Sequence, residues 1–244
     1  MTDLHTHILP GMDDGAKDLS AALSLVERQL MQGVRRVALT SHYHCESETL
    51  EEFLHRRENA FAALRGACPQ EIRLKRGCEV FFSPQLMHMD LSPLCLEGTN
   101  VLLLELPVLQ KPAFLREVLT ELRQRGIRPL IAHVERYQYV AQDPRILSDW
   151  MALGALIQVN AQSVIDGGLA RRLIKWGLCQ VIASDAHSVR NRPPNLRQAL
   201  STVSKTLGPD KARRLERNAA ALFSGMEISP EAPHIPQKVL GIWL

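Results

Sequence analysis

The chain opens, over residues 1–17, with the stretch MTDLHTHILPGMDDGAK. This pattern is typical of a short β segment that ends in His5-x-His7 and leads into a turn rich in glycine, proline and aspartate. Residues two apart in a strand project from the same face, so the His5 and His7 side chains can reach one point. Two imidazoles with carboxylates close behind them form half of a metal site. The rest of the chain must then supply the other half.

The composition is that of an ordinary globular protein. The chain has 244 residues, of which 45% are apolar and 23% charged, and its net charge is +3. This length suits a single α/β barrel. So small a charge, without a basic run, argues against nucleic acid as a partner. No apolar run approaches the ~20 residues of a membrane span, and the N-terminus lacks a signal-peptide pattern. Five scattered cysteines without a CxxC pair fit reduced thiols. We therefore expect a cytoplasmic protein without direct membrane insertion.

Short apolar strands alternate with helices along the chain. Strands are expected at residues 34–40, 72–82, 101–104, 127–132, 155–159 and 180–183. Helices are expected near residues 19–31, 48–65, 112–125, 144–153, 169–176, 196–207 and 210–223. This alternation requires parallel strands with right-handed crossovers, and about seven units favour a closed or nearly closed barrel. The prediction is an α/β fold, a distorted TIM-like (β/α)7 barrel in one domain over residues 1–226, followed by a proline-rich, apolar tail over 227–244.

Residue types that bind metals stand at the carboxyl ends of these strands and in the first loop. They are His5, His7, Asp14, His42, Glu79, Glu105, His133, Asp185 and His187. Parallel strands of a barrel converge on one face, where active sites lie, so we expect one cluster. This many nitrogen and oxygen ligands suits two or three divalent ions, with manganese favoured and zinc, iron or magnesium as alternatives. Asp13 is an alternative to Asp14 as the ligand from the first loop.

Each of these residues, taken singly, also has an ordinary structural interpretation. Glu105 would be a salt-bridge partner, His42 a satisfied core histidine and Asp185 a helix cap. The coincidence of such residues at most of the expected strand ends favours the metal site over these separate interpretations. The remaining histidines differ: we expect His44 at the rim of the site and His55, His88 and His234 on the surface.

Six short motifs carry a resemblance to a known family. They are DLHTHILPGMDDG (3–15), ALTSH (38–42), GCEV (77–80), LLELP (103–107), IAHVER (131–136) and ASDAH (183–187). With them the chain resembles the polymerase-and-histidinol-phosphatase (PHP) superfamily and, within it, the bacterial tyrosine-protein phosphatases of capsular and exopolysaccharide loci. The HxH opening alone is shared by many metallohydrolases, whereas the DDGAK turn, HVER and NRPP (191–194) are more specific to the phosphatases.

The resemblance implies a distorted barrel of the PHP type and a trinuclear metal site. The three ions would be held by His5, His7, Glu79 and Asp185, by Glu79, Glu105 and His133, and by Asp14, His42 and His187. It also implies that Arg136 and Arg192 bind the substrate phosphate, which agrees with the bidentate geometry of a guanidinium. The ordinary alternatives are a salt bridge from Arg136 to Glu135 or Asp143, and a plain loop charge for Arg192.

These features predict metal-assisted hydrolysis of a phosphomonoester without a covalent phosphoenzyme. Water activated between two ions would attack phosphorus in line, and Arg136 and Arg192 would stabilise charge on the phosphoryl oxygens. His187, or else His44, is a candidate for protonating the leaving phenolate. Thiolate catalysis is excluded because no cysteine is followed by an arginine at the required spacing, and no GxGxxG follows a strand to bind a dinucleotide.

The resemblance implies a phosphotyrosine protein substrate, namely the tail of a membrane-bound tyrosine autokinase that controls polysaccharide export. Two alternatives stay open: a small-molecule phosphatase of the histidinol-phosphatase type, and a non-catalytic metal-binding domain on the same fold. The sequence is also compatible with an oligomer. The apolar run at 239–244 is expected to dock on the barrel, with a second subunit or a membrane-bound partner as alternatives. Cys78, beside Glu79, should point to the opposite face and pack there.

Overall fold

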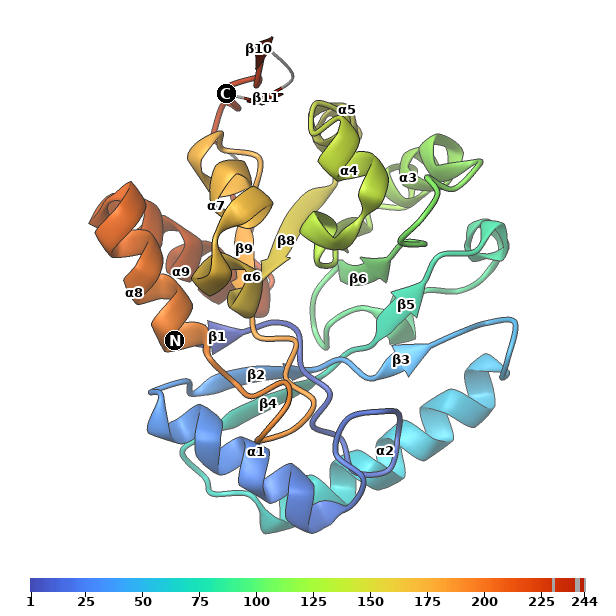
Figure 1. The fold of residues 1–244 in the computed structure, drawn as a ribbon. Helices are drawn as coiled ribbons and strands as arrows, with labels where there is room; N and C mark the ends of the chain where they lie inside the picture. The colour runs from blue at the N-terminus through green and yellow to red at the C-terminus, as the bar shows by residue number, and fades with distance from the viewer. Residues whose placement is uncertain (230, 240–241, 244) are drawn as a thin grey trace.

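Two parallel sheets form the centre of the molecule (Figure 1). The structure, a computed structural model, describes residues 1–229, 231–239 and 242–243. One sheet has the order β1-β2-β4, with β1 at Thr2–Asp3, β2 at Arg36–Leu39 and β4 at Arg73–Arg76. The other has the order β3-β5-β6-β7-β8-β9. Its strands are His42–Tyr43, Glu79–Phe81, Val101–Glu105, Arg128–Ile131, Leu156–Asn160 and Val181–Ala183. All pairings in these sheets are parallel, which confirms the expected α/β class.

One strand expected to be continuous is broken in the middle. The stretch 72–82 becomes β4 followed by β5, whereas β2 lies within the expected stretch 34–40 and a further short strand, β3, follows it. At the break the Thr40 amide bonds the Thr6 carbonyl at 2.9 Å, while the Glu79 amide is shared between the carbonyls of Thr40 and Ser41 at 3.1 Å. The bend leaves His42 directly opposite Glu79 in the register of β3 and β5. It therefore brings two of the expected ligands onto neighbouring strands.

The segment after β1 lies beside the end of β9, although the two are far apart in sequence. The Asp185 amide bonds the His5 carbonyl and the His7 amide bonds the Ala186 carbonyl, both at 2.9 Å. Thr6 and Ala186 form a parallel bridge between them. Regular strand geometry in the opening segment is limited to Thr2–Asp3, so the predicted β segment is shorter than its sequence pattern indicates.

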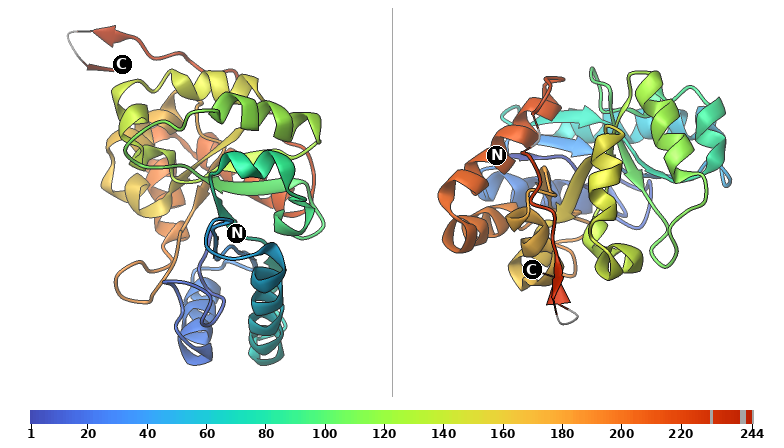
Figure 2. Two further views of the ribbon diagram at one scale, coloured as in Figure 1. Left: turned by 90° about the vertical axis from the view of Figure 1, so that its right-hand side faces the viewer. Right: turned by 90° about the horizontal axis from the view of Figure 1, so that it is seen from above.

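Helices surround the sheets. α1 (Leu19–Met31) and α2 (Leu50–Ala67) lie below β1, β2 and β4, where Figure 2 shows them projecting side by side. The other helices are α3 (Leu115–Gln124), α4 (Gln138–Gln142), α5 (Ile146–Ala152), α6 (Ala161–Asp166), α7 (Gly168–Lys175), α8 (Leu196–Leu207) and α9 (Pro209–Phe223), and short 3-10 turns lie at Pro84–His88, Ser92–Leu94 and Val134–Arg136. The expected helices are confirmed. α4 and α6 were not predicted because helices this short carry too little periodicity.

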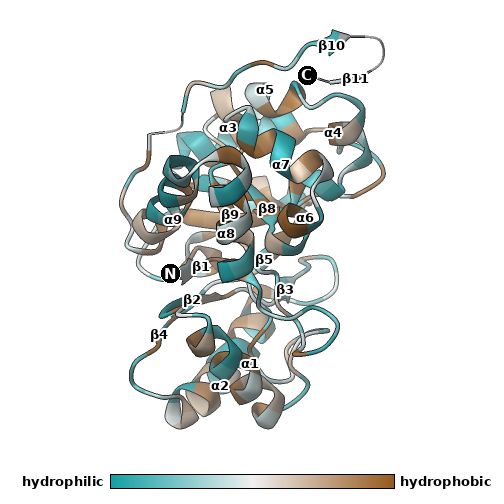
Figure 3. Ribbon diagram, turned by 60° about the vertical axis from the view of Figure 1, so that its left-hand side comes forward, coloured by the Kyte–Doolittle hydropathy of each residue, from teal (hydrophilic) through white to brown (hydrophobic). Residues whose placement is uncertain are grey.

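Most residues of β5 to β9 are buried, so side chains on both faces of the sheet are covered, in keeping with a parallel sheet between helices. Figure 3 shows hydrophobic residues along the central strands. One apolar cluster includes Leu102, Leu104 and Ile131. A second includes Leu103 and Leu130 from the alternate positions, together with residues of α9. Successive residues of β6 thus enter different clusters, as the strand period of two requires. Cys78 is buried with its Sγ 3.3 Å from the Leu94 carbonyl, which confirms its packing role.

The described part of the tail folds back on its own chain. β10 (Lys238–Val239) and β11 (Ile242–Trp243) pair antiparallel. The Trp243 Nε1 donates to the Gln142 carbonyl at 3.2 Å, and the Arg145 guanidinium lies 5.1 Å from the indole centroid. Trp243 is therefore docked on α4 and α5, as predicted for the tail. Residues 240, 241 and 244 of the predicted apolar run lie outside the described residues.

Candidate metal centre

The carboxyl ends of the strands bring the expected ligand residues into one cluster. His5 and His7 follow β1, His42 lies in β3, Glu79 begins β5 and Glu105 ends β6. The others are His133 after β7, Asp185 and His187 after β9, and Asp14 in the first loop. His5, His7, Glu79, His133, Asp185 and His187 are buried. His55, His88 and His234 are exposed, as expected.

Four ligand atoms converge at the centre of the cluster. The Nε2 atoms of His5 and His7 lie 3.1 Å apart. Oε2 of Glu79 lies 3.1 Å from the first and 3.2 Å from the second. Oδ1 of Asp185 completes the group at 3.4 and 3.5 Å from the same two nitrogens. Ligands bound at about 2.0–2.2 Å around one tetrahedral ion are separated by about this much.

The hydrogen bonds behind the two imidazoles fix which nitrogen faces the centre. The His7 Nδ1 donates to Oδ2 of Asp13 at 2.7 Å. The His5 Nδ1 donates to Oε1 of Gln158 at 3.3 Å. Because both Nδ1 atoms carry the proton, both Nε2 atoms present lone pairs toward each other and toward the Glu79 carboxylate. The two lone pairs and the carboxylate repel one another unless a cation or extra protons lie between them.

A second group of atoms lies between Glu79 and Glu105. The His133 Nε2 lies 2.9 Å from Oε1 of Glu79 and 3.6 Å from Oε1 of Glu105. The His42 Nδ1 lies 3.2 Å from Oε2 of Glu79 and 3.7 Å from Oε2 of Glu105. Oε2 of Glu79 thus faces His5, His7 and His42, while its Oε1 faces His133, so the Glu79 carboxylate contacts both groups.

The third group lies at the solvent-facing side of the cluster. Oδ1 of Asp14 lies 3.2 Å from the His187 Nε2 and 3.5 Å from the His42 Nε2. These three residues and His7 offer ligand atoms that all lie within 4.8 Å of one another. Asp13 instead bonds the outer nitrogen of His7 and accepts the backbone amide of His42 at 3.0 Å. The geometry thus places Asp14 in the cluster and Asp13 behind it.

The residues present fit divalent cations. Buried polar atoms that face this cluster and lack a hydrogen-bond partner in the described part of the chain include Glu79 Oε2, Asp185 Oδ1, His42 Nδ1 and His187 Nε2. Leaving such groups unpaired costs roughly 1–3 kcal/mol each, and more for a charge. Nitrogen and carboxylate oxygen are donors that manganese, zinc and iron accept. Coordination would satisfy these atoms together.

Burial and neighbouring charges shift the pKa values of several groups in the cluster. Burial raises the pKa of Glu105 to about 7, and the charge of Glu79 acts in the same direction. Burial opposes ionisation of Asp185 too, but His5 and His7 in their protonated forms outweigh it and hold the pKa of Asp185 below its usual range. Burial, with the charge of His7, lowers the pKa of His187 to about 4. Crowded acids and bases of this kind mark functional sites more often than structural ones.

Backbone strain positions two of the ligand residues. His133 and Asp185 have φ values of +30° and +54°, in the left-handed region that non-glycine residues rarely adopt. Both residues stand just after a strand end, so this conformation turns the chain while the side chain enters the cluster. A conformation that costs on the order of 1–3 kcal/mol persists where its surroundings enforce it.

The two predicted phosphate-binding arginines lie at the rim. The Arg192 Nη2 bonds Oδ2 of Asp185, and its Nη1 lies 3.9 Å from Oδ2 of Asp14. The Arg136 Nη1 lies 3.7 Å from the same Asp185 oxygen. Their side chains are 39% and 44% exposed, so each reaches the cluster from solvent. The alternative partner Asp143 pairs with Arg145 instead, at 2.7 Å.

His44, the other candidate acid, lies beside the cluster rather than in it. Its ring stacks on Phe81 at 5.0 Å between centroids and lies 5.8 Å from the ring of His42. His187 is closer to the reacting region because its Nε2 faces Asp14. Its Nδ1 donates to the Asp185 carbonyl at 2.9 Å, which fixes the ring.

Sequence reasoning missed two polar residues of β8 that support the cluster. Oε1 of Gln158 accepts from the His133 amide at 2.8 Å as well as from His5. The Gln158 Nε2 donates to Oδ1 of Asn160, whose Nδ2 donates to Oδ2 of Asp185 at 2.8 Å. The signal was the pattern Leu-Ile-Gln-Val-Asn, in which amides two apart interrupt an otherwise apolar buried strand.

Comparison with known proteins places the chain among bacterial tyrosine phosphatases. Tyrosine-protein phosphatase YwqE of Bacillus subtilis is 28% identical, over 100% of both chains. Tyrosine-protein phosphatase CpsB of Streptococcus agalactiae is 26% identical over 88% of this chain and 94% of its own. A putative tyrosine-protein phosphatase CapC of Staphylococcus aureus is 28% identical over 96% and 95%.

A solved structure agrees with this relationship. It comes from work on YwqE of B. subtilis and CpsB of Streptococcus pneumoniae, described as unique metal-dependent tyrosine phosphatases. It superposes with a TM-score of 0.87 at 26% identity, over 96% of this chain and 99% of its own.

In the described residues no helix is long and apolar enough to cross a membrane. The family model described as capsular polysaccharide synthesis, CpsB/CapC, matches residues 1–224, so this chain belongs to that family.

Proposed function

We propose that this protein is a metal-dependent phosphatase that hydrolyses phosphotyrosine on proteins of capsular or exopolysaccharide synthesis. The observation that carries the proposal is the convergence of two lone-pair nitrogens and two carboxylates on one buried point, at His5, His7, Glu79 and Asp185. The names of the relatives support the substrate class, because each is called a tyrosine-protein phosphatase.

Two or three divalent ions would occupy the cluster, with manganese favoured. His5, His7, Glu79 and Asp185 would hold one ion, Glu79, Glu105 and His133 a second, and Asp14, His42 and His187 a third. His42 stands between the second and third groups, since its two ring nitrogens face Glu79 and Asp14 respectively. When bound, such ions would supply Lewis acidity and make water nucleophilic near neutral pH.

The strands that carry these ligands would form, with their helices, a distorted (β/α)7 barrel. In this view β2 with β3, and β4 with β5, each count as one bent strand. The Thr6–Ala186 bridge supports this arrangement because it joins the segment after β1 to the end of β9. A barrel of this kind explains why ligands separated along the whole chain meet at one end.

The chain's own residues would bind and orient the phosphate. Arg136 and Arg192 would exchange their contacts with Asp185 for the phosphoryl oxygens, which accept bidentate hydrogen bonds from guanidinium. Both arginines are half-exposed and so are free to make that exchange. The Nδ1 of His187 is held by the Asp185 carbonyl, so its Nε2 would either bind the third ion or, with only two ions bound, donate a proton to the leaving phenolate.

The physiological substrate would be a membrane-bound tyrosine autokinase, which the protein would meet from the cytoplasm. A test compares turnover of a phosphotyrosine peptide with turnover of histidinol phosphate, before and after EDTA and with Mn, Zn or Mg added back. We expect metal-dependent turnover with clear preference for the peptide. Preference for histidinol phosphate would favour the small-molecule alternative. Metal binding without hydrolysis of either substrate would favour the non-catalytic one.

A further inference from the structure

A second cluster of positive charge lies at the other end of the strands from the metal centre. Arg36 is the first residue of β2 and Arg73 the first of β4. The ligands His42 and Glu79 follow the carboxyl ends of the same two strands. Since the strands are parallel, the arginines and the metal centre lie at opposite ends of the sheet.

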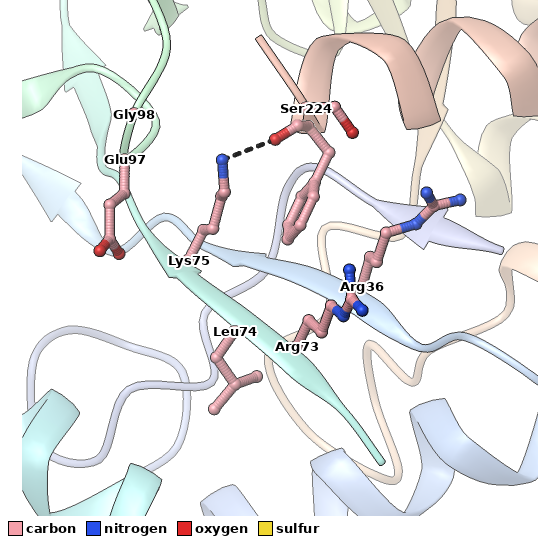
Figure 4. Close-up of a pocket in the computed structure, with 8 residues that line it drawn as sticks. Arg36, Arg73, Leu74, Lys75, Glu97, Gly98 and Ser224 are labelled. Atoms are coloured by element: carbon pink, nitrogen blue, oxygen red, sulfur yellow. Dashed lines mark hydrogen bonds between the residues drawn. The ribbon is translucent and has the colours of Figure 1, made fainter. Parts of the chain in front are cut away.

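The sheet register forces the two arginines together. Arg36 and Arg73 are direct partners in the ladder between β2 and β4. Lys75 is two residues further along β4 and so shares the face of Arg73. Figure 4 shows Arg36, Arg73 and Lys75 on one side of the strands and Leu74 pointing to the other. Like charges directly opposite on neighbouring strands destabilise a sheet.

Protein groups do not neutralise the two guanidinium groups. Neither forms an ion pair with any residue that the structure describes. The acidic side chains that border them are engaged elsewhere: Glu97 bonds Arg76 at 2.7 Å, and Glu71 lies 3.9 Å from Arg35. The Lys75 Nζ donates to the Phe223 carbonyl at 2.8 Å, which fixes the third charge in place.

The three cations line a cavity of about 530 Å³ that is completed by Glu97, Gly98, Phe223 and Ser224. A neighbouring cavity of about 260 Å³ shares Arg36 and Arg73 and adds Met1, Arg35 and Glu71. The larger volume lies in the range of small-molecule sites. Three cations and one carboxylate face it, and that carboxylate, of Glu97, is paired with Arg76, so the excess of positive charge favours an anionic ligand.

We propose that this cavity between β2, β4 and the end of α9 binds a small multivalent phosphorylated anion. Arg36 and Arg73 each offer a planar fork of donors to phosphoryl oxygens, and Lys75 adds a third cation from the same face. A bound anion would also remove the repulsion between the paired arginines. The site is separate from the substrate site because it lies at the far ends of the strands, so ligand there would not compete with substrate for the arginines at the rim of the metal centre.

The test follows the side-chain Nε–Hε resonances of the arginines by NMR in the full chain loaded with diamagnetic Zn²⁺. Inorganic phosphate is titrated at constant ionic strength, with chloride as the control anion. Spectra of Arg36→Gln and Arg73→Gln assign the two signals. We expect saturable shifts of both with phosphate and not with chloride, and about tenfold weaker binding when one arginine is replaced, as loss of a charge-assisted hydrogen bond implies.

Linear shifts that are equal for phosphate and chloride would overturn the proposal, as would unchanged binding in the variants. A second measurement uses thermal unfolding, with Arg116→Gln on the exposed surface of α3 as a matched control. We expect Arg73→Gln to raise the melting temperature without phosphate and to lose part of the stabilisation that phosphate gives to the parent protein. A melting temperature that falls or stays unchanged in Arg73→Gln without phosphate would show that the arginine pair carries no repulsion, and would count against the site.

Discussion

The His7 Nδ1 donates a 2.7 Å hydrogen bond to Oδ2 of Asp13, which lies six residues later in the chain. The same carboxylate accepts the amides of Gly15 and His42 at 3.0 Å, so it is held from three sides. A Cβ at Gly15 would lie 2.1 Å from the His7 carbonyl oxygen, so the turn needs glycine to come this close. The first loop therefore orients His7 through Asp13 while Asp14 faces the cluster.

Replacing Asp13 by Asn should weaken metal binding without removing a ligand. The amide cannot hold His7 in the same tautomer as firmly, and changes of this kind cost about 10–100-fold in metal affinity. Excess metal should then restore most of the activity. Metal affinity is measured by titration with a competing chelator, and Asp149→Asn on the exposed side of α5 is the control. Wild-type affinity in the Asp13 variant would show that the hydrogen bond does not tune the site.

Replacing His133 by Ala should lose metal and activity together. The imidazole faces the buried Glu79 and the partly buried Glu105, so its removal takes one ligand from the group that these carboxylates share. Metal content after dialysis and phosphotyrosine-peptide turnover both report the effect, with His88→Ala as an exposed control. Full metal content with normal turnover would exclude His133 as a ligand.

Replacing Arg192 or Arg136 by Ala should separate metal binding from catalysis. Neither guanidinium is expected to coordinate metal, so metal content should stay at the wild-type level. The value of kcat should fall about 10²–10³-fold, the usual effect of removing a donor to the reacting oxygens. Arg190→Ala, in the same loop as Arg192, is the matched control. Unchanged turnover in the Arg192 and Arg136 variants would refute their phosphate-binding role.

The sequence allowed prediction of the ligands because their positions obey a simple rule. Parallel strands place their carboxyl ends together, so Glu105 at the end of β6, His133 after β7 and Asp185 after β9 had to converge. The break between β4 and β5 could not be foreseen, since there the Glu79 amide meets the carbonyls of Thr40 and Ser41, which are distant in sequence. The supporting amides were also missed, because Gln158 differs from an ordinary buried polar residue only through its partners.

Replacing Gln158 by Met should destabilise the fold and disturb the cluster. Oε1 of Gln158 accepts from the buried His133 amide and from the His5 imidazole, and methionine offers neither group an acceptor of similar strength. An unsatisfied buried donor costs about 1–3 kcal/mol. Urea unfolding of the metal-free protein measures this cost independently of metal, with Gln124→Met at the exposed end of α3 as the control. Equal stability of the two variants would mean that water or a rearranged side chain satisfies the amide.

Replacing Trp243 by Ala should release the tail without changing catalysis. Trp243 is 8% exposed, donates to the Gln142 carbonyl and lies beneath the Arg145 guanidinium, and these contacts are remote from the metal cluster. Their loss should raise the population in which the tail is open by about tenfold, the equivalent of one cation–π contact and one hydrogen bond. Trypsin cleavage after Lys238 under native conditions reads this population directly, because cleavage requires local opening. Cleavage at the wild-type rate would indicate that Trp243 does not hold the tail, whereas a matching loss of kcat/KM would show that the tail supports the site through α4.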